Sequence, residues 1–145
     1  MVRFAITRDV DAPAAAVWAV LADFGDTSWI PVDSRIDVEG SGIGMRRSIH
    51  GAGAEPVIET LTHLDPAGME LGYSIVNNPL PVSRFEAVVT VRPLGAGGTA
   101  ITWNVECEPL GPTEADAAAA RSAIEAVYGM MAGWLGEAAG ARGRT

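Results

Sequence analysis

Glu59 and Arg47 are the residues of this chain whose types and placement suit chemistry inside a protein. The strand-like segment that contains Glu59 alternates so that Val57, Glu59 and Leu61 share one face. An isolated carboxylate on an interior face would cost several kcal/mol. Arg47 lies one strand earlier with inward parity, so the pattern predicts a buried Arg47–Glu59 ion pair. The alternative is that the face is misassigned and that Glu59 points to solvent.

The other candidates for catalysis or metal binding are His50, His63 and Cys107. Glu59 and His63 are four residues apart, which on a strand separates them by about 13 Å, too far to share one ion. The two histidines and the one cysteine form no zinc-binding pattern, and a single cysteine excludes an intramolecular disulfide. We therefore expect no metal and no other cofactor.

Aromatic and sulfur-containing side chains could also face a cavity. Tyr73, Trp103 and Tyr128 could each present a polar group there, although residues of these types more often belong to an ordinary core. Met130 and Met131 in the last third of the chain fit either an adaptable pocket wall or a filled core.

The length and composition are those of one globular domain. The chain has 145 residues, of which 48% are hydrophobic and 19% charged. Its net charge of −8 repels phosphate backbones, so we expect no nucleic-acid partner. The sequence shows neither a signal-peptide pattern nor a membrane span, so we expect a cytoplasmic protein. Residues 1–140 are predicted to form the domain and residues 141–145 a flexible tail.

The hydrophobic pattern predicts seven strands and three helices. The strands are expected at residues 3–10, 32–38, 45–50, 55–64, 69–76, 83–92 and 99–108. The helices are expected at residues 14–22, around Trp29 up to Pro31, and at residues 112–139. The glycine-rich segment 39–44 does not match a phosphate-binding loop and indicates a hairpin turn.

The last helix carries the strongest single pattern. Thr113 and Asp116 resemble a capping box at its start. Its predicted apolar face consists of Ala117, Ala120, Ile124, Val127, Met131, Leu135 and Ala138. A long amphipathic helix after an antiparallel sheet predicts an α+β fold in which the sheet curls around the helix. Val127 and Met131 are then expected to face Glu59 and Trp103 across a cavity.

Short motifs in a characteristic order extend over nearly the whole chain. They are Asp11–Pro13 before a helix with Val17 and Trp18, Asp23–Gly25 with Trp29, Gly42 and Gly44 with Arg47, Glu59 to Asp65, Tyr73 with Ile75, Thr99 to Trp103, and Tyr128–Met130. This order resembles the START-like, or SRPBCC, superfamily, in particular its polyketide cyclase/dehydrase and lipid-transport group. The resemblance implies a helix-grip fold: a seven-stranded antiparallel sheet, two short helices after the first strand, and a long C-terminal helix gripped around a deep apolar cavity.

The chain is more distantly similar to the plant abscisic acid receptors. That resemblance implies that Glu59 lines the ligand cavity, that residues 50–54 correspond to the gate loop and that residues 79–82 correspond to the latch loop. The lysine that those receptors use to hold an acidic ligand falls on Ile30. The receptors' ligand and signalling role are therefore not expected here.

We expect a protein that binds a small hydrophobic or aromatic, polyketide- or lipid-like molecule, as a monomer or homodimer. Arg47, Glu59 and Tyr73 would orient this molecule. The expected contact residues are Ile30, Ile75, Leu80, Phe85, Trp103, Val127 and Met131.

Two other functions remain open from the sequence. The chain could be a cyclase, dehydratase or isomerase with Glu59 as general acid or base and Arg47 stabilising an enolate oxygen. A close Arg47 would, however, favour the charged form of Glu59 and weaken it as a base. The third hypothesis is a regulatory or co-chaperone-like module, although the sequence has no exposed aromatic stripe to support it.

Overall fold

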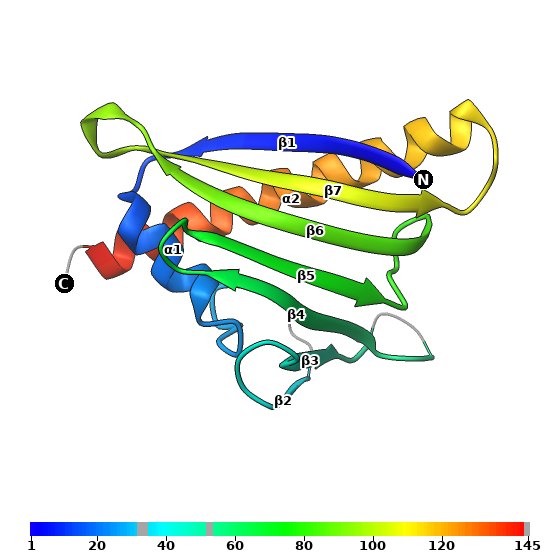
Figure 1. The fold of residues 1–145 in the computed structure, drawn as a ribbon, viewed down its shortest axis with the longest axis horizontal. Coiled ribbons are helices and arrows are strands. Elements are labelled where there is room, and N and C mark those ends of the chain that lie inside the picture. The colour runs from blue at the N-terminus through cyan, green and yellow to red at the C-terminus, as the bar shows by residue number, and fades with distance from the viewer. Residues whose placement is uncertain (32–34, 52–53, 144–145) are drawn as a thin grey trace.

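In the part of the chain that the structure describes, seven antiparallel strands form one sheet in the order β1-β7-β6-β5-β4-β3-β2 (Figure 1). The computed structural model describes residues 1–31, 35–51 and 54–143, and the side chains as far as Gly140. The strands are β1 (Val2–Val10), β2 (Ile36–Glu39), β3 (Arg46–Ile49), β4 (Val57–Asp65), β5 (Glu70–Val76), β6 (Val82–Pro93) and β7 (Thr99–Pro109). The predicted seven-stranded antiparallel sheet and the α+β class are confirmed; residues 32–34 of the second predicted strand and residues 52–53 of the predicted gate loop lie outside the described residues.

The inner face of the sheet is the one that alternation predicts. Phe85, Val89 and Val91 of β6 and Ile101 and Trp103 of β7 are almost fully buried. Between these residues, most of the side chains on the outer face are polar. Apolar alternation at period two therefore specifies which side of the sheet forms the core.

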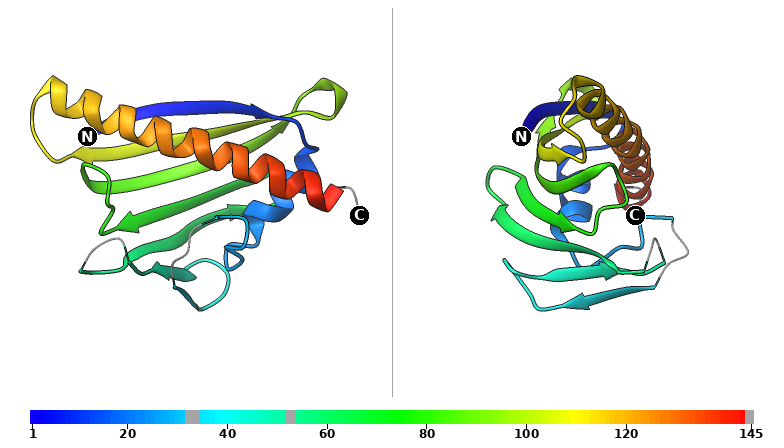
Figure 2. Two further views of the ribbon diagram at one scale, coloured as in Figure 1. Left: turned by 180° about the vertical axis from the view of Figure 1, so that it is seen from behind. Right: turned by 90° about the vertical axis from the view of Figure 1, so that its right-hand side faces the viewer.

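Two helices pack against the inner face: α1 (Ala14–Ala22) and α2 (Glu114–Gly143) (Figure 2). A short 3₁₀ turn, Gly95–Gly97, connects β6 and β7. The predicted capping box forms at the start of α2, where the Thr113 hydroxyl accepts a hydrogen bond from the Asp116 amide at 3.1 Å and donates one to Asp116 Oδ2 at 2.8 Å. The hydrogen bonds that Asp116 Oδ2 accepts from the Thr113 hydroxyl and, at 3.1 Å, from the Thr113 backbone amide lower the pKa of the Asp116 carboxyl. At its other end α2 continues to Gly143, into the segment expected to be a tail.

The second short helix expected around Trp29 does not form. Residues 23–31 contain turns, closed by hydrogen bonds from Asp26 N to Asp23 O at 2.9 Å and from Ile30 N to Thr27 O at 3.0 Å. The Asp26 carboxylate also accepts a hydrogen bond from the Ser28 amide at 3.0 Å. Such side-chain hydrogen bonds stabilise turns in competition with a helix.

The face of α2 that contacts the core differs slightly from the predicted one. Ala120, Ile124 and Leu135 are buried as predicted, but the fully buried line continues through Tyr128, Ala132 and Ala139. Val127, Met131 and Ala138 are half-buried along one side of that line. The apolar stripe of α2 is wider than one row of helical positions. The row that contacts the core is therefore fully buried, and the neighbouring row at the edge of the stripe is only half-buried.

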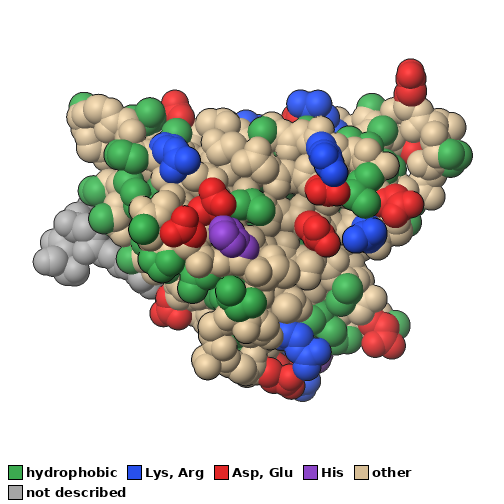
Figure 3. All heavy atoms as spheres, viewed as in Figure 1, with side chains coloured by type: hydrophobic (Ala, Val, Ile, Leu, Met, Phe, Trp, Pro, Cys, Tyr) green, Lys and Arg blue, Asp and Glu red, His purple; other side chains and the backbone are tan. Residues whose placement is uncertain are grey.

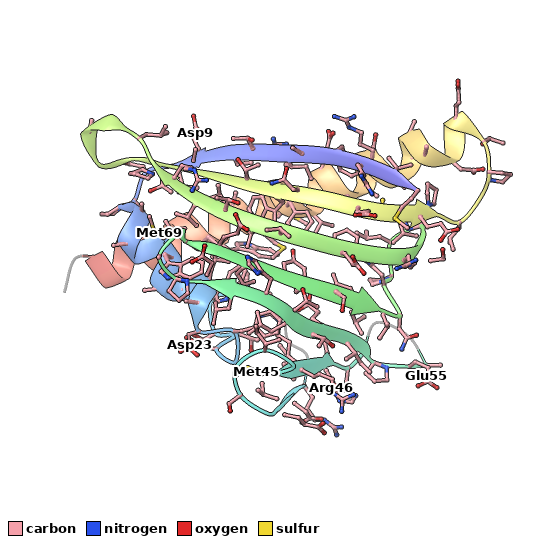
Figure 4. The ribbon with its side chains drawn as sticks, in the orientation of Figure 1. Asp9, Asp23, Met45, Arg46, Glu55 and Met69 are labelled. Carbon is pink, nitrogen blue, oxygen red and sulfur yellow. The ribbon has the colours of Figure 1, made fainter. Side chains whose placement is uncertain are left out.

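The sheet is bent, and α2 covers part of it. The β4–β5 pairing has a bulge between Leu61 and His63, and the β6–β7 pairing is irregular between Val82 and Arg84. The helix α2 packs mainly on α1, β1 and β7 (Figure 2). The inner faces of β3, β4 and β5 therefore curve away from the line of the helix. Asp9 and Met69 lie at the end of the sheet nearest α1, whereas Glu55 lies at the opposite end (Figure 4).

Candidate functional site

A cavity of about 280 Å³ lies between the sheet and α2. Its wall consists of Ile30, Arg47, Ile49, Val57, Glu59, Ile75, Asn78, Pro79, Leu80, Phe85, Val127, Tyr128, Met131 and Trp134. Most of these side chains are apolar, as is typical of sites for oily molecules.

The floor of the cavity is one row of side chains that crosses four strands. Arg47 of β3 pairs with Glu59 of β4, Glu59 with Ile75 of β5, and Ile75 with Phe85 of β6. Directly opposed residues of antiparallel strands point to the same face, so the register itself brings these four together. Val127 and Met131 on the half-buried side of α2 complete the space from above.

Arg47 and Glu59 form the predicted ion pair. Arg47 Nε donates a hydrogen bond to Glu59 Oε1 at 2.6 Å, and the residues are 5% and 9% exposed. The prediction of an inward Glu59 is thus confirmed, and the solvent-facing alternative is wrong. Because the two opposite charges lie side by side, this end of the cavity carries no net charge.

Arg47 is held by Phe24 as well. Its Nη1 donates a hydrogen bond to the Phe24 carbonyl oxygen at 3.1 Å, and its Cζ lies 4.0 Å from the centre of the Phe24 ring. Phe24 lies two residues after the end of α1, so Arg47 connects the chain after α1 to β3 and β4. These contacts fix the guanidinium in place and make it part of the framework of the cavity.

Two tyrosines meet at the boundary between the cavity and the packed core. The hydroxyls of Tyr73 and Tyr128 are hydrogen-bonded to each other, and the Tyr128 side chain also forms part of the cavity wall. Burial raises the pKa of both hydroxyls well above the usual value, and the nearby Glu59 carboxylate adds to the rise. Both groups therefore remain neutral.

The structure places eight of the ten predicted ligand contacts in the cavity wall: Ile30, Arg47, Glu59, Ile75, Leu80, Phe85, Val127 and Met131. Tyr73 and Trp103 lie instead in the packed core toward α1, beside a residual void of about 10 Å³. Both side chains point to the inner face, as their alternation predicts. Tyr73, however, lies two residues before Ile75 along β5, and Trp103 pairs with Val89 rather than with Phe85. Parity specifies the face of a strand residue, not its distance along the sheet.

Several wall residues did not stand out in the sequence. Trp134 lies three residues after Met131 and seven after Val127, so helical periodicity could have identified it. Asn78 belongs to the Asn-Asn-Pro loop after β5, where no periodic pattern applies. Its side-chain Oδ1 accepts a hydrogen bond from the Leu80 amide at 3.0 Å, which orders the loop that borders the cavity.

A second hollow, of about 420 Å³, lies on the outer face of the sheet over β1, β6 and β7. Charged side chains of both signs mix with apolar ones across this face (Figure 3). The hollow is bordered by the exposed Arg3–Glu106 ion pair, with Arg3 Nη2 and Glu106 Oε1 at 3.3 Å. Because this hollow is open and its charges are already paired, the cavity between the sheet and α2 is the better candidate site.

Two further features bear on the class of protein. Among the described residues, His, Cys, Asp and Glu side chains do not gather in groups of three or more that could hold a metal ion. Nor is any helix in the described part of the chain long and apolar enough to cross a membrane.

Comparison with known families gives one match over most of the chain. The model of the family described as "Polyketide cyclase / dehydrase and lipid transport" matches residues 1–136. No curated protein matches the sequence.

Solved structures share the fold. A protein from Thermobifida fusca, solved by NMR, is 25% identical with a TM-score of 0.71, and the match covers 86% of this chain and 83% of that one. Ara h 8.0201 is 15% identical with a TM-score of 0.71, over 95% and 97% of the two chains. Norcoclaurine synthase from Thalictrum flavum is 16% identical with a TM-score of 0.71, over 94% and 86%. The likeness to the last two shows the fold alone.

Proposed function

Because this chain belongs to the polyketide cyclase/dehydrase and lipid transport family, we propose that it binds a small, largely apolar molecule of aromatic or polyketide-like character in the cavity between the sheet and α2. The observation that carries the proposal is an open space of about 280 Å³ where a folded core would ordinarily be filled by side chains.

The size of the cavity supports a compact guest. An apolar cavity of roughly 150 Å³ is enough to bind benzene. The volume here is a little less than twice that value, which suits a molecule of about two fused rings. A long lipid chain would require the cavity to widen.

The electrostatics of the cavity support a neutral guest. Arg47 and Glu59 offset each other's charge at 2.6 Å, and the tyrosine hydroxyls stay protonated. An anionic or cationic guest would lose its hydration without gaining a free counter-charge. Burial of apolar surface then supplies most of the binding free energy.

The same contact between Arg47 and Glu59 argues against the catalytic alternative. A general base needs a carboxylate oxygen free to face the substrate, but Glu59 Oε1 is already occupied by a hydrogen bond from Arg47 Nε at 2.6 Å. Arg47 in turn already donates hydrogen bonds to Glu59 and to the Phe24 carbonyl oxygen. It is therefore poorly placed to stabilise negative charge that develops on an oxygen of a substrate.

Binding of ethylnaphthalene, measured by isothermal titration calorimetry, tests the proposal. We expect one molecule bound per chain, and Met131→Trp should abolish or greatly weaken binding by filling the cavity. Met130→Trp is the matched control, since Met130 is the neighbouring residue of the same type and is 53% exposed. Absence of binding to the wild-type chain, or equal effects of the two substitutions, would contradict the proposal.

A further inference from the structure

Asn78 presents a buried hydrogen-bond donor without a partner. Among the described residues, its Nδ2 atom is buried and makes no hydrogen bond. An amide donor removed from water and left unpaired costs free energy, and native proteins keep few such groups. This donor therefore needs an explanation in terms of something that satisfies it.

The orientation of the Asn78 amide is fixed by its other end. Oδ1 accepts a hydrogen bond from the Leu80 backbone amide at 3.0 Å. A flipped side chain would place the NH₂ group against that N–H donor, so the flip is excluded by hydrogen bonding. The unpaired atom of Asn78 is thus a donor, and its missing partner is an acceptor.

The surroundings of Asn78 indicate where that acceptor comes from. Asn78, Pro79 and Leu80 together form one side of the cavity wall. The charged and hydroxyl groups of the wall already have partners: Arg47 and Glu59 bond to each other, and the Tyr128 hydroxyl bonds to Tyr73. Asn78 Nδ2 itself has almost no accessible surface, so a guest in the adjoining cavity supplies the acceptor once the neighbouring side chains make room for it.

We propose that Asn78 recognises a carbonyl oxygen of the guest, so that the protein selects neutral aromatic ketones, quinones or lactones over hydrocarbons of the same shape. This inference rests on the proposed binding function and deepens it. A carbonyl accepts a hydrogen bond from an amide without bringing net charge into a cavity whose charged groups already offset each other.

Two probes of nearly equal shape test the proposal: acetylnaphthalene, which carries a carbonyl, and ethylnaphthalene, in which a CH₂ group replaces it. The measured quantity is the ratio of their dissociation constants by calorimetry. Asn78→Asp keeps the acceptor for the Leu80 amide and replaces the donor by an oxygen. We expect this substitution to shift the ratio against the ketone by about three- to tenfold, as the loss of one hydrogen bond implies.

Asn77→Asp is the matched control. It makes the same chemical change one residue earlier, where the amide donates to the Pro56 carbonyl at 3.0 Å and lies outside the cavity wall. The ratio of the two dissociation constants should stay at the wild-type value. A second measurement uses the wild-type chain alone. The side-chain amide NMR signal of Asn78 should move downfield when acetylnaphthalene is added and stay in place when ethylnaphthalene is added.

The outcomes separate the two proposals. Binding of both probes with a ratio unchanged by Asn78→Asp, or with an unmoved Asn78 amide signal, overturns the carbonyl inference and leaves the binding function standing. If neither probe binds the wild-type chain, the proposed function itself fails.

Discussion

Arg47 and Glu59 face each other directly across β3 and β4, with Arg47 Nε 2.6 Å from Glu59 Oε1 at the floor of the cavity. The pair lies where the sheet curves away from α2, so two charges sit in a largely apolar wall. Each charge depends on the other, because neither has bulk water around it. The pair therefore contributes both to the stability of the fold and to the absence of net charge at the floor of the cavity.

Breaking the pair should destabilise the protein strongly. We expect Glu59→Gln or Arg47→Met to lower the free energy of unfolding by roughly 3–5 kcal/mol, since each leaves one buried charge uncompensated. The double variant Arg47→Met/Glu59→Gln should lose less than the two single changes combined. Urea denaturation of the four proteins measures this coupling.

The neighbouring pair Arg46–Glu39 supplies the control for that cycle. Arg46 Nη2 lies 2.9 Å from Glu39 Oε2, but both side chains are more than half exposed. Its coupling should stay below about 1 kcal/mol. A coupling of similar size in both cycles would mean that burial does not distinguish the two pairs.

The hydrogen-bonded hydroxyls of Tyr73 and Tyr128 predict a loss of stability at high pH. Burial raises the pKa of each above the ordinary value of 10.0, whereas in the unfolded chain both titrate near that value. The unfolded state therefore releases protons first, and stability is intact below about pH 10 and falls above it. The expected slope is about 1.4 kcal/mol per pH unit for each tyrosine.

These are the two tyrosines of the chain, so tyrosinate absorbance reports on them alone. We expect this absorbance to rise together with loss of the circular dichroism signal of the folded state. Tyr128→Phe should reduce the slope by about half. Tyrosinate that forms near pH 10 in a still folded protein would contradict the burial of the pair.

The sequence predicted the sheet, the gripping helix and the ion pair because each depends on a periodic or paired signal. Glu59 interrupts an apolar alternation, and an interior carboxylate requires a cation, which Arg47 on the preceding strand can supply. The register then placed them opposite each other. Side-chain period and charge pairing are local rules that tertiary packing rarely reverses.

Tyr73, Trp103 and Asn78 show where those rules end. Which inward residues border open space depends on how far α2 leans across the sheet, and that is set by its packing on α1, β1 and β7. Tyr73 and Trp103 lie on the covered side, whereas Ile75 and Phe85 lie on the uncovered one. Asn78 belongs to a loop, whose position no period describes.

The bulge in β4 predicts a specific intolerance at Gly72 of β5. A Cβ atom at Gly72 would lie 3.0 Å from His63 Cβ and 3.2 Å from Thr62 Oγ1. We expect Gly72→Ala to cost about 1–3 kcal/mol through overpacking beside the bulge. Gly95→Ala is the control, since a Cβ there meets no atom within 4 Å. Equal thermal unfolding midpoints for the two variants would contradict the crowding.

Ile30 contributes an uncharged side chain to the cavity wall at a position where a cation could hold a carboxylate. It belongs to the cavity wall, which also contains Glu59 and an Arg47 whose charge is already offset. The wild-type chain should therefore bind naphthoate more weakly than acetylnaphthalene, because the carboxylate loses hydration without gaining a free cation.

A lysine at this position should reverse that preference. We expect Ile30→Lys to raise the affinity for naphthoate by about tenfold or more, the order of one charge-assisted hydrogen bond, and to make binding sensitive to salt. Ile30→Met, similar in length but uncharged, should leave the order of the two probes unchanged. If the introduced lysine pairs with Glu59 instead, naphthoate affinity will not rise in calorimetry. That result would mean that Arg47 does not hold Glu59 firmly enough to keep the floor of the cavity neutral.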